Sequence, residues 1–343
     1  GCNSLTSITI PEDVTRIGGE AFGGCESLIN ITIPDGVTYI GNEAFSWCEN
    51  LTSITIPERI TSIGIEAFGG CKSLTSVTIP EGVASIGNYA FLGCSSLTSI
   101  TIPEGVAHIR EHAFSGCENL TSVTIPEGVT GIGEAAFLNC SSLTSVTIPE
   151  SVTSIGEDAF YECSSLTRVT FAENSKLTTI GEYAFNCCYS LTSITIPESV
   201  TNINKGAFYC CKGLADVYIT DLAAWCQIDF TDSQATPMFY AKNIYLNGEK
   251  IVSVTVPGGI TEVKAYTFFG FKDLIQVTIP EGVTTIGDGA FYSCTSLISI
   301  NIPEGVTAIG EYAFYGCSSL TSITIPDSVT SIGEQAFYDC TSL

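Results

Sequence analysis

Leucine recurs along this chain at a strict spacing. The period is 23 residues up to Leu166, and it resumes after two longer steps, of 25 residues to Leu191 and of 37 residues from Leu214 to Ile251. The positions are Leu5, Leu28, Leu51, Leu74, Leu97, Leu120, Leu143, Leu166, Leu191, Leu214, Ile251, Leu274, Leu297, Leu320 and Leu343. A fixed period of this length predicts a repeat solenoid, in which each repeat forms one turn.

Each repeat begins with alternating apolar and polar positions. In residues 74–96, Val77 and Ile79 alternate with hydroxyl residues, which is the two-residue period of a strand with one buried face. Pro80 ends this strand because it has no N–H to donate. A second short strand and a helical or 3₁₀ turn are expected around Val83, Ile86 and Ala90–Phe91.

One phenylalanine in each repeat predicts the core. A single repeat cannot bury its apolar side, but stacked copies can, because like residues then lie over one another in columns. The column is Phe22, Phe45, Phe68, Phe91, Phe114, Phe137, Phe160, Phe185, Phe208, Phe268, Phe291, Phe314 and Phe337. We expect one continuous solenoid, with regular repeats over 1–213 and 251–343 and an irregular repeat over 214–250.

The repeat pattern L-x-x-I-x-I-P-x-x-V-x-x-I-x-x-x-A-F-x-x-C resembles the BspA-like, or Treponema pallidum-type, leucine-rich repeat of bacterial and protozoan surface proteins. The resemblance implies a right-handed solenoid with a parallel β-sheet on the concave face and short strands or 3₁₀ turns on the convex face. It also implies a secreted or cell-surface protein involved in adhesion. It implies no catalytic residues, because the family shares no active site.

The charge is strongly acidic, with 36 Asp and Glu against 12 Lys and Arg, a net charge of −24. This balance argues against nucleic acid, whose phosphates would be repelled. No run of 18 apolar residues occurs, so membrane insertion is not expected. Both ends fall at the same phase of the repeat, which indicates a piece of a longer chain, without its signal peptide or anchor.

Most of the 16 cysteines stand in one column, three residues before the leucine. Phe271 takes the equivalent place in one repeat, so the position is expected to hold a small buried apolar side chain. The spacing favours a reduced thiol ladder over disulfides or a metal site, because metal ligands converge instead of forming a file.

Cys187 and Cys210 lie outside that column. Each comes one residue earlier, where other repeats place residues as different as Gly24, Trp47 and Glu162. This variety suggests an exposed position. Stacking of successive repeats would place the two Cα atoms within reach of a disulfide, so we expect an oxidisable surface pair.

Both histidines lie in the string His108-Ile109-Arg110-Glu111-His112, which has the H-x-x-E-H form of some zinc proteases. That motif requires a helix, whereas Ile109 belongs to the second short strand, so the imidazoles are expected to diverge. A chance match is favoured over a zinc site. No Walker A, dinucleotide-binding or nucleophile-elbow motif is present, and we expect neither enzymatic activity nor a cofactor or metal.

The carboxylates form two files along the repeats. One follows the proline, and the second includes Glu134, Glu157, Glu182, Asp288, Glu311 and Glu334. Neighbours in a file are expected about 5 Å apart, the strand spacing, and would repel each other. A solvated edge that keeps the protein soluble is the favoured interpretation, and divalent cations between adjacent acids are the alternative.

The irregular repeat collects aromatic residues. Asp221 is expected to cap a short helical turn, and Asn247-Gly248 to form a type I′ hairpin turn. Five aromatic residues are candidate ligand contacts, because loop insertions on regular scaffolds often carry function: Tyr218, Trp225, Phe239, Tyr240 and Tyr245. The alternative is a self-packed insertion whose rings fill the gap in the core columns.

These features favour a non-enzymatic interaction or adhesion module that binds a host or other extracellular protein, or a glycan. The competing hypothesis is a structural spacer that holds another domain away from the cell surface. Nearly identical outward Ser and Thr residues from repeat to repeat favour the spacer, since selective sites need varied side chains. The aromatic insertion favours binding.

Overall fold

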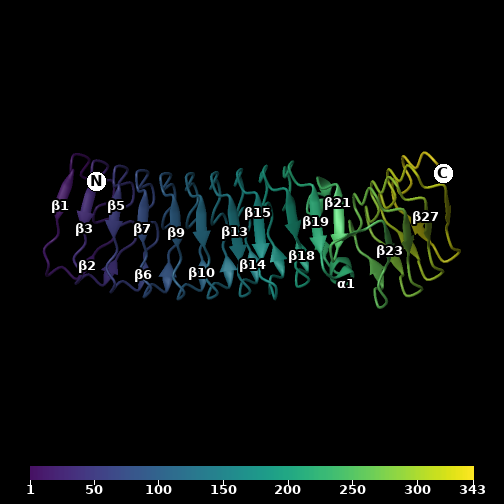
Figure 1. The fold of residues 1–343 in the computed structure, drawn as a ribbon, viewed down its shortest axis with the longest axis horizontal. Coiled ribbons are helices and arrows are strands. Elements are labelled where there is room, and N and C mark those ends of the chain that lie inside the picture. The colour runs from purple at the N-terminus through teal and green to yellow at the C-terminus, as the bar shows by residue number, and fades with distance from the viewer. The chain divides into compact units, whose positions relative to one another are not determined.

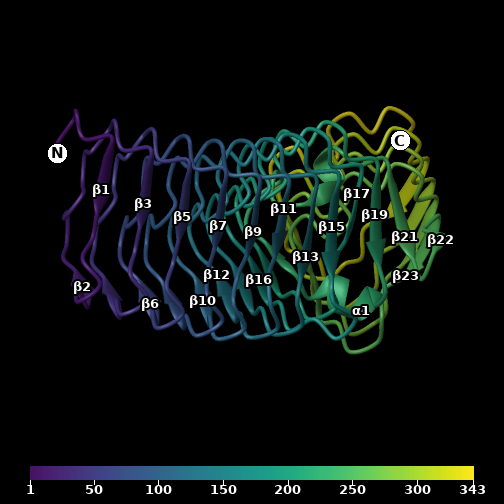
Figure 2. The same ribbon diagram turned by 60° about the vertical axis from the view of Figure 1, so that its left-hand side comes forward.

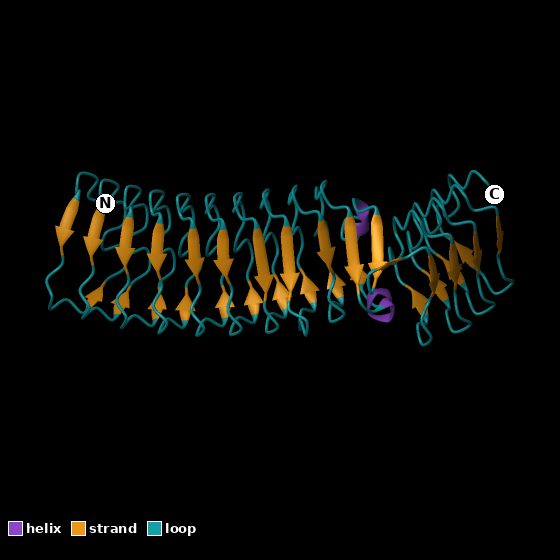
Figure 3. Ribbon diagram, in the orientation of Figure 1, coloured by secondary structure: helices purple, strands orange, loops and turns teal.

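The computed structural model describes the whole chain, residues 1–343. The chain forms two compact units: unit 1 contains residues 1–177 and 183–191, and unit 2 contains residues 178–182 and 192–343. Each unit is a stack of short parallel strands joined by turns, with very little helix (Figures 1 and 3). The predicted repeat solenoid is confirmed in both. The irregular segment 214–250 lies inside unit 2.

The first strand of each repeat in unit 1 starts two residues after the repeat leucine. These strands pair in parallel with a register of one repeat, so that Ile8 lies beside Ile31 and Val146 beside Val169. Their central apolar residue points into the core and the flanking hydroxyl residues point outward. The strands are β1 (Ser7–Thr9), β3 (Asn30–Thr32), β5 (Ser53–Thr55), β7 (Ser76–Thr78), β9 (Ser99–Thr101), β11 (Ser122–Thr124), β13 (Ser145–Ile148) and β15 (Arg168–Phe171).

A second, two-residue strand follows in the first seven repeats of unit 1, and it too pairs with a copy one repeat away. Ile109, for example, lies beside Ile132. The isoleucine of each second strand is buried in the core. These strands are β2 (Arg16–Ile17), β4 (Tyr39–Ile40), β6 (Ser62–Ile63), β8 (Ser85–Ile86), β10 (His108–Ile109), β12 (Gly131–Ile132) and β14 (Ser154–Ile155).

Unit 2 repeats the same plan on both sides of the irregular segment (Figure 2). Its first strands are β17 (Ser193–Thr195), β19 (Asp216–Ile219), β21 (Asn243–Leu246), β23 (Ser253–Thr255), β25 (Gln276–Thr278), β27 (Ser299–Asn301) and β29 (Ser322–Thr324). Its second strands are β16 (Thr179–Ile180), β18 (Asn202–Ile203), β20 (Asp229–Phe230), β24 (Glu262–Val263), β26 (Thr285–Ile286), β28 (Ala308–Ile309) and β30 (Ser331–Ile332).

The irregular segment builds one long turn of the stack and then a hairpin. Asp221 caps helix α1 (Leu222–Cys226) by accepting from the N–H groups of Ala223 and Ala224, as predicted. After β20 and the 3₁₀ helix η1 (Pro237–Phe239), strand β21 pairs in parallel with β19. The chain then reverses at Asn247-Gly248, both at positive φ, and β22 (Glu249–Lys250) pairs antiparallel with β21. The predicted cap and hairpin are confirmed.

The phenylalanine column forms a continuous ring stack within each unit. In unit 1, centroids of neighbouring rings from Phe22 to Phe185 lie 5.3–5.5 Å apart, and in unit 2 those from Phe268 to Phe337 lie 5.2–5.3 Å apart. Most of these side chains have no solvent exposure. The rings are therefore the largest single source of buried apolar surface in a repeat.

From Cys25 onward, the column cysteines are buried beside the rings. From Cys48 onward, each Sγ–H in unit 1 donates to the carbonyl oxygen of the phenylalanine one repeat earlier, at 3.2–3.4 Å. Burial raises the pKa of Cys117 and of Cys163 to about 12. Phe271 is buried in the same column, as expected. The thiols act as small apolar side chains with one weak donor each.

Replacing one mid-stack ring should destabilise unit 1. Phe114→Ala removes contacts with the rings of Phe91 and Phe137 and leaves a cavity, so we expect a loss of about 3–5 kcal/mol in the free energy of unfolding, measured by urea denaturation followed by circular dichroism. Ser122→Ala, on an exposed outward position, is the control and should change stability by less than about 0.5 kcal/mol. Equal effects of the two changes would contradict the stacking model.

Thiol reactivity should follow burial. At pH 8 burial keeps the reagent away from most column thiols, and the raised pKa keeps those of Cys117 and Cys163 protonated, so Ellman's reagent should titrate Cys2 and Cys210 first in the native chain. Unfolding in guanidinium should then expose all 16 thiols. A count of 14, which is 16 minus two, after unfolding without reductant would indicate one disulfide. Fast reaction of many native thiols would contradict the buried ladder.

Candidate functional site

The five aromatic candidates of the irregular segment occupy three different places in unit 2. Tyr218 and Tyr245 lie on neighbouring first strands, Trp225 lies in the core, and Phe239 and Tyr240 lie at the end of η1. They do not form one site. Each group has a different exposure and different neighbours.

Tyr218 and Tyr245 form a stacked pair on the outward side of the strands. They are register partners on β19 and β21, with ring centroids 4.9 Å apart and planes 16° from parallel. Tyr218 takes the place of an outward threonine, since its register partner on β17 is Thr195. Desolvation, followed by the nearby Asp216 carboxylate, raises the pKa of Tyr218, so its hydroxyl is neutral at pH 7. The pair offers two half-buried rings with hydroxyl donors.

Beyond the hairpin, three successive repeats expose an aliphatic residue directly after the repeat leucine or its equivalent. Val252, Ile275 and Ile298 are 44%, 46% and 48% exposed. We call these three residues the aliphatic row. Backbone N–H groups connect them in order, from Ile275 to Val252 and from Ile298 to Ile275. Most repeats of unit 1 carry threonine in this column, with Ile29 as an exposed exception.

The hairpin connects the tyrosine pair to the aliphatic row. Lys250 lies opposite Tyr245 in the β21–β22 register, and Val252 follows two residues later. Lys250 Nζ lies 2.6 Å from a carboxylate oxygen of Asp273 in the next repeat, so an ion pair joins the hairpin to the turn before β25. The tyrosine pair, Lys250 and the aliphatic row together are called the mixed apolar face below.

Trp225 is a core residue, which corrects its assignment as a ligand contact. Its side chain is 1% exposed and lies against the rings of Phe230 and Phe271, with centroids 5.3 and 6.1 Å away. Its Nε1–H donates to the carbonyl oxygen of Thr267 at 2.8 Å. The indole fills the core where the irregular repeat has no residue in the phenylalanine and cysteine columns. For Trp225, the alternative interpretation of a self-packed insertion is therefore the correct one.

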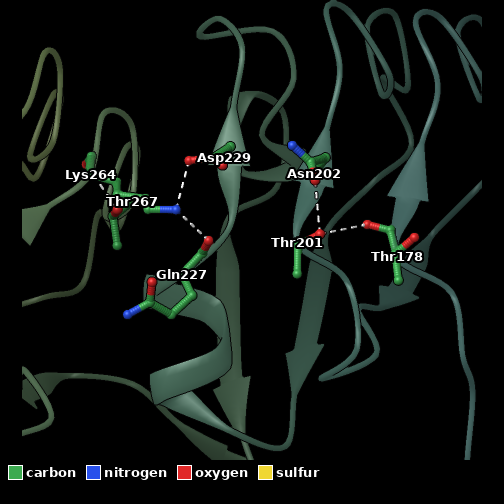
Figure 4. Close-up of polar contacts among 7 residues, drawn as sticks. All are labelled: Thr178, Thr201, Asn202, Gln227, Asp229, Lys264 and Thr267. Atoms are coloured by element: carbon green, nitrogen blue, oxygen red, sulfur yellow. Dashed lines mark hydrogen bonds and ion pairs between the residues drawn. The ribbon is translucent and has the colours of Figure 1, made fainter. Parts of the chain in front are cut away.

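A second anchor holds the insertion to the following repeat on the opposite side. Figure 4 shows Lys264 reaching β20, where its Nζ donates to the carbonyl oxygen of Gln227 and to Asp229 Oδ1, both at 2.7 Å. Thr267, whose carbonyl accepts from Trp225, lies in the same turn. The insertion is thus tied to the next repeat by one buried and one partly exposed contact.

Phe239 and Tyr240 belong to a different group of rings. Phe239 stacks on Phe269 at 6.0 Å, and the stack continues with centroids 4.7–5.2 Å apart through Tyr292, Tyr315 and Tyr338. Tyr209 also contacts Phe239 and Tyr240. In the sequence, the signal for this row of rings is the aromatic residue that directly follows the column phenylalanine. These residues were not among the predicted site residues. Because the rings cover each other's faces, the row mainly presents its edges.

Cys187 is buried, with 8% exposure, which corrects its expected surface position, whereas Cys210 is partly exposed. Both have a φ of 59°. The variety of residues in this column reflects the left-handed backbone, which glycine adopts at Gly24, Gly70 and Gly93. A side chain there leans over the neighbouring repeat: the Trp47 ring covers Gly70. Variety in the column therefore does not indicate exposure, and the disulfide remains a proposal.

The H-x-x-E-H string is not helical. His108 lies in β10, with its Nδ1 3.3 Å from Thr130 Oγ1, whereas His112 lies in the following turn at a φ of 50°. His112 stacks on Tyr89, with centroids 4.9 Å apart. The two imidazoles have different surroundings and do not form the helical protease motif.

None of the helices in the structure has the length and apolar character that crossing a bilayer requires. Stacked parallel strands with a leucine at the start of each turn define a leucine-rich-repeat protein. The chain belongs to the BspA type leucine rich repeat family, whose model matches in six copies over residues 1–121, 107–233 and 241–343. The family resemblance that the repeat pattern indicated is therefore confirmed.

The solved structure of a Bacteroides protein supports this assignment. A leucine-rich repeat protein from Bacteroides ovatus is 34% identical over 98% of this chain and 85% of its own, with a TM-score of 0.72. A leucine rich cell surface protein from Faecalibacterium prausnitzii is 29% identical over 99% of this chain and 86% of its own, with a TM-score of 0.37. No curated protein matches the chain.

Removing the Trp225 hydrogen bond should weaken unit 2. Trp225→Phe keeps a ring in the core but leaves the Thr267 carbonyl without its donor, so we expect a loss of about 1–3 kcal/mol in the free energy of unfolding, measured by urea denaturation. The matched control is Trp47→Phe, because Trp47 is 47% exposed, and it should change stability by less than about 0.5 kcal/mol. A larger effect at Trp47 would contradict the core role of Trp225.

Proposed function

We propose that this chain is the interaction module of a secreted or cell-surface protein and that it binds another extracellular protein through the mixed apolar face of unit 2. The observation that carries the proposal is the replacement of polar column residues by the half-buried Tyr218 and Tyr245 and by the exposed Ile275 and Ile298. Family membership supports a binding role, and the name of the Faecalibacterium structure supports a surface location.

The chemistry of the face favours a protein partner over a glycan. Glycans stack on the open faces of aromatic rings, but Tyr218 and Tyr245 cover one face of each other. The aliphatic row has no hydrogen-bonding group to offer a sugar, whereas exposed apolar side chains beside tyrosines are typical of protein interfaces. If the partner is a host protein, the proposed binding is adhesion to the host.

A spacer role is supported by a different observation, the uniform outward surface of unit 1. Its first strands present Ser and Thr in nearly every repeat, as in β5, β7, β9 and β11. Such a surface has little to distinguish one partner from another. In the spacer hypothesis the mixed apolar face would have no partner.

Restoring the repeat residues should abolish binding. Fluorescent beads coated with the chain would be applied to cultured epithelial cells, and the beads that stay bound would be counted. Beads that carry the variant Tyr218→Thr/Tyr245→Thr/Ile275→Thr/Ile298→Thr should be retained at least about tenfold less than beads that carry the native chain, since each lost contact costs about 1 kcal/mol or more. Ile29→Thr removes an exposed aliphatic residue from the same column in unit 1 and should bind normally.

Treating the cells separates the partner classes. Loss of bead retention after protease treatment supports a protein partner, and loss only after glycosidase treatment would replace it with a glycan. Equal retention of the native chain and the fourfold variant would overturn the proposed face. No retention of the native chain on any cell layer would favour the spacer.

A further inference from the structure

Three side chains that can bind a metal ion converge on one turn of unit 1. Glu111 and His112 follow β10, and Glu134 occupies the position equivalent to Glu111 in the next repeat. One ligand atom from each side chain lies within 4.8 Å of the others. The His112 N–H donates to the carbonyl oxygen of Glu134 at 2.9 Å, so the backbone itself joins the two turns at this point.

Neighbouring side chains hold two of the three donors in place. The His112 ring stacks on Tyr89, with planes 11° from parallel. Glu111 accepts hydrogen bonds from the Tyr89 hydroxyl and, at 3.1 Å, from Asn88 Nδ2. Outer contacts of this kind orient the ligands of a metal site before the ion binds. In the next repeat the His112 position is taken by Ala135.

The charge of the cluster favours a cation. Glu111 and Glu134 belong to one file of acids on neighbouring turns and repel each other. None of the four ion pairs in the structure involves either carboxylate; they join Lys72, Lys176, Lys250 and Lys264 to acids elsewhere. Glu111 and His112 are partly exposed and Glu134 is exposed, so an ion can reach the cluster directly from solvent.

We propose that Glu111, His112 and Glu134 form a zinc-binding site. An imidazole nitrogen and carboxylate oxygens are both zinc ligand types, and three protein ligands leave a fourth position that a water molecule fills. Ligands of a tetrahedral zinc ion lie about 3.4 Å apart for bonds of about 2.0–2.1 Å. Because the ligand atoms lie within 4.8 Å of one another, the side chains need to close by up to about 1.4 Å when the ion binds. The imidazole disfavours calcium and magnesium, which prefer oxygen ligands.

Unit 2 contains a natural comparison in which the imidazole is missing. Glu311 and Glu334 form the same pair on neighbouring turns, and Tyr312 stands at the position equivalent to His112. The backbone contact is also the same, since the Tyr312 N–H donates to the carbonyl oxygen of Glu334 at 2.9 Å. Comparing the two turns separates the contribution of the histidine from that of the paired acids.

The experiment is a titration of the full reduced chain with zinc chloride, followed by isothermal calorimetry. The native chain is expected to bind one zinc ion. His112→Tyr, which gives this turn the residue of the second turn, should weaken binding by at least about 100-fold, since loss of outer contacts alone costs 10–100-fold. Glu134→Gln should also weaken it. Tyr312→His should raise the stoichiometry from one ion to two.

Cobalt identifies the ligands. Cobalt bound at this site should give visible bands without a thiolate charge-transfer band in the near ultraviolet, and His112→Tyr should remove those bands. Circular dichroism of His112→Tyr checks that the variant is folded. Three results would each overturn the proposal: no zinc binding by the native chain, a stoichiometry and affinity unchanged by His112→Tyr, or a thiolate band, which would assign the metal to cysteine.

Discussion

In-register stacking of each repeat on the next is the interaction on which the rest of each unit depends. A register of one repeat places Phe over Phe, Ile over Ile and Cys over Cys, and it pairs the backbone of neighbouring turns in both strand rows. No single turn could bury its ring or satisfy its own backbone. The identity of a buried residue is therefore determined by the columns above and below it, while the outward positions of the same strands are free to vary.

The irregular segment has to satisfy the same constraint with different residues. Its turn lacks the column Phe and Cys, and Trp225 fills that volume by packing against Phe271. The chain thereby keeps β19 and β21 in parallel register. The outward side has no such requirement, and there Tyr218 and Tyr245 stand where the register allows any side chain that fits a strand. The replacement of core residues by Trp225 and the outward tyrosines therefore occur in the same turn for separate reasons.

The sequence predicted what local chemistry or strict periodicity determines. The Phe and Cys columns, the Asp221 cap and the Asn247-Gly248 hairpin each follow from residues within one or two repeats. It did not distinguish Trp225 from Tyr218, because composition does not reveal which side of a strand or helix faces the core. The burial of Cys187 was mispredicted because a left-handed backbone, like an exposed position, admits many residue types. Glu134 comes close to Glu111 and His112 only because their two repeats stack on each other, so no single repeat reveals this cluster.

Function in a repeat protein is expected where a column departs from its usual residue without a packing reason. Trp225 and Phe271 depart from their columns, but each repairs the core. Val252, Ile275 and Ile298 also depart, yet they expose apolar surface that stabilises nothing within the fold. His112 replaces residues such as Tyr89 and Tyr312 in a turn that tolerates all of them. Exposed apolar residues lower solubility, and an additional metal ligand such as His112 is not needed for packing. The simplest reason for keeping such residues is that they contact a molecule outside the chain.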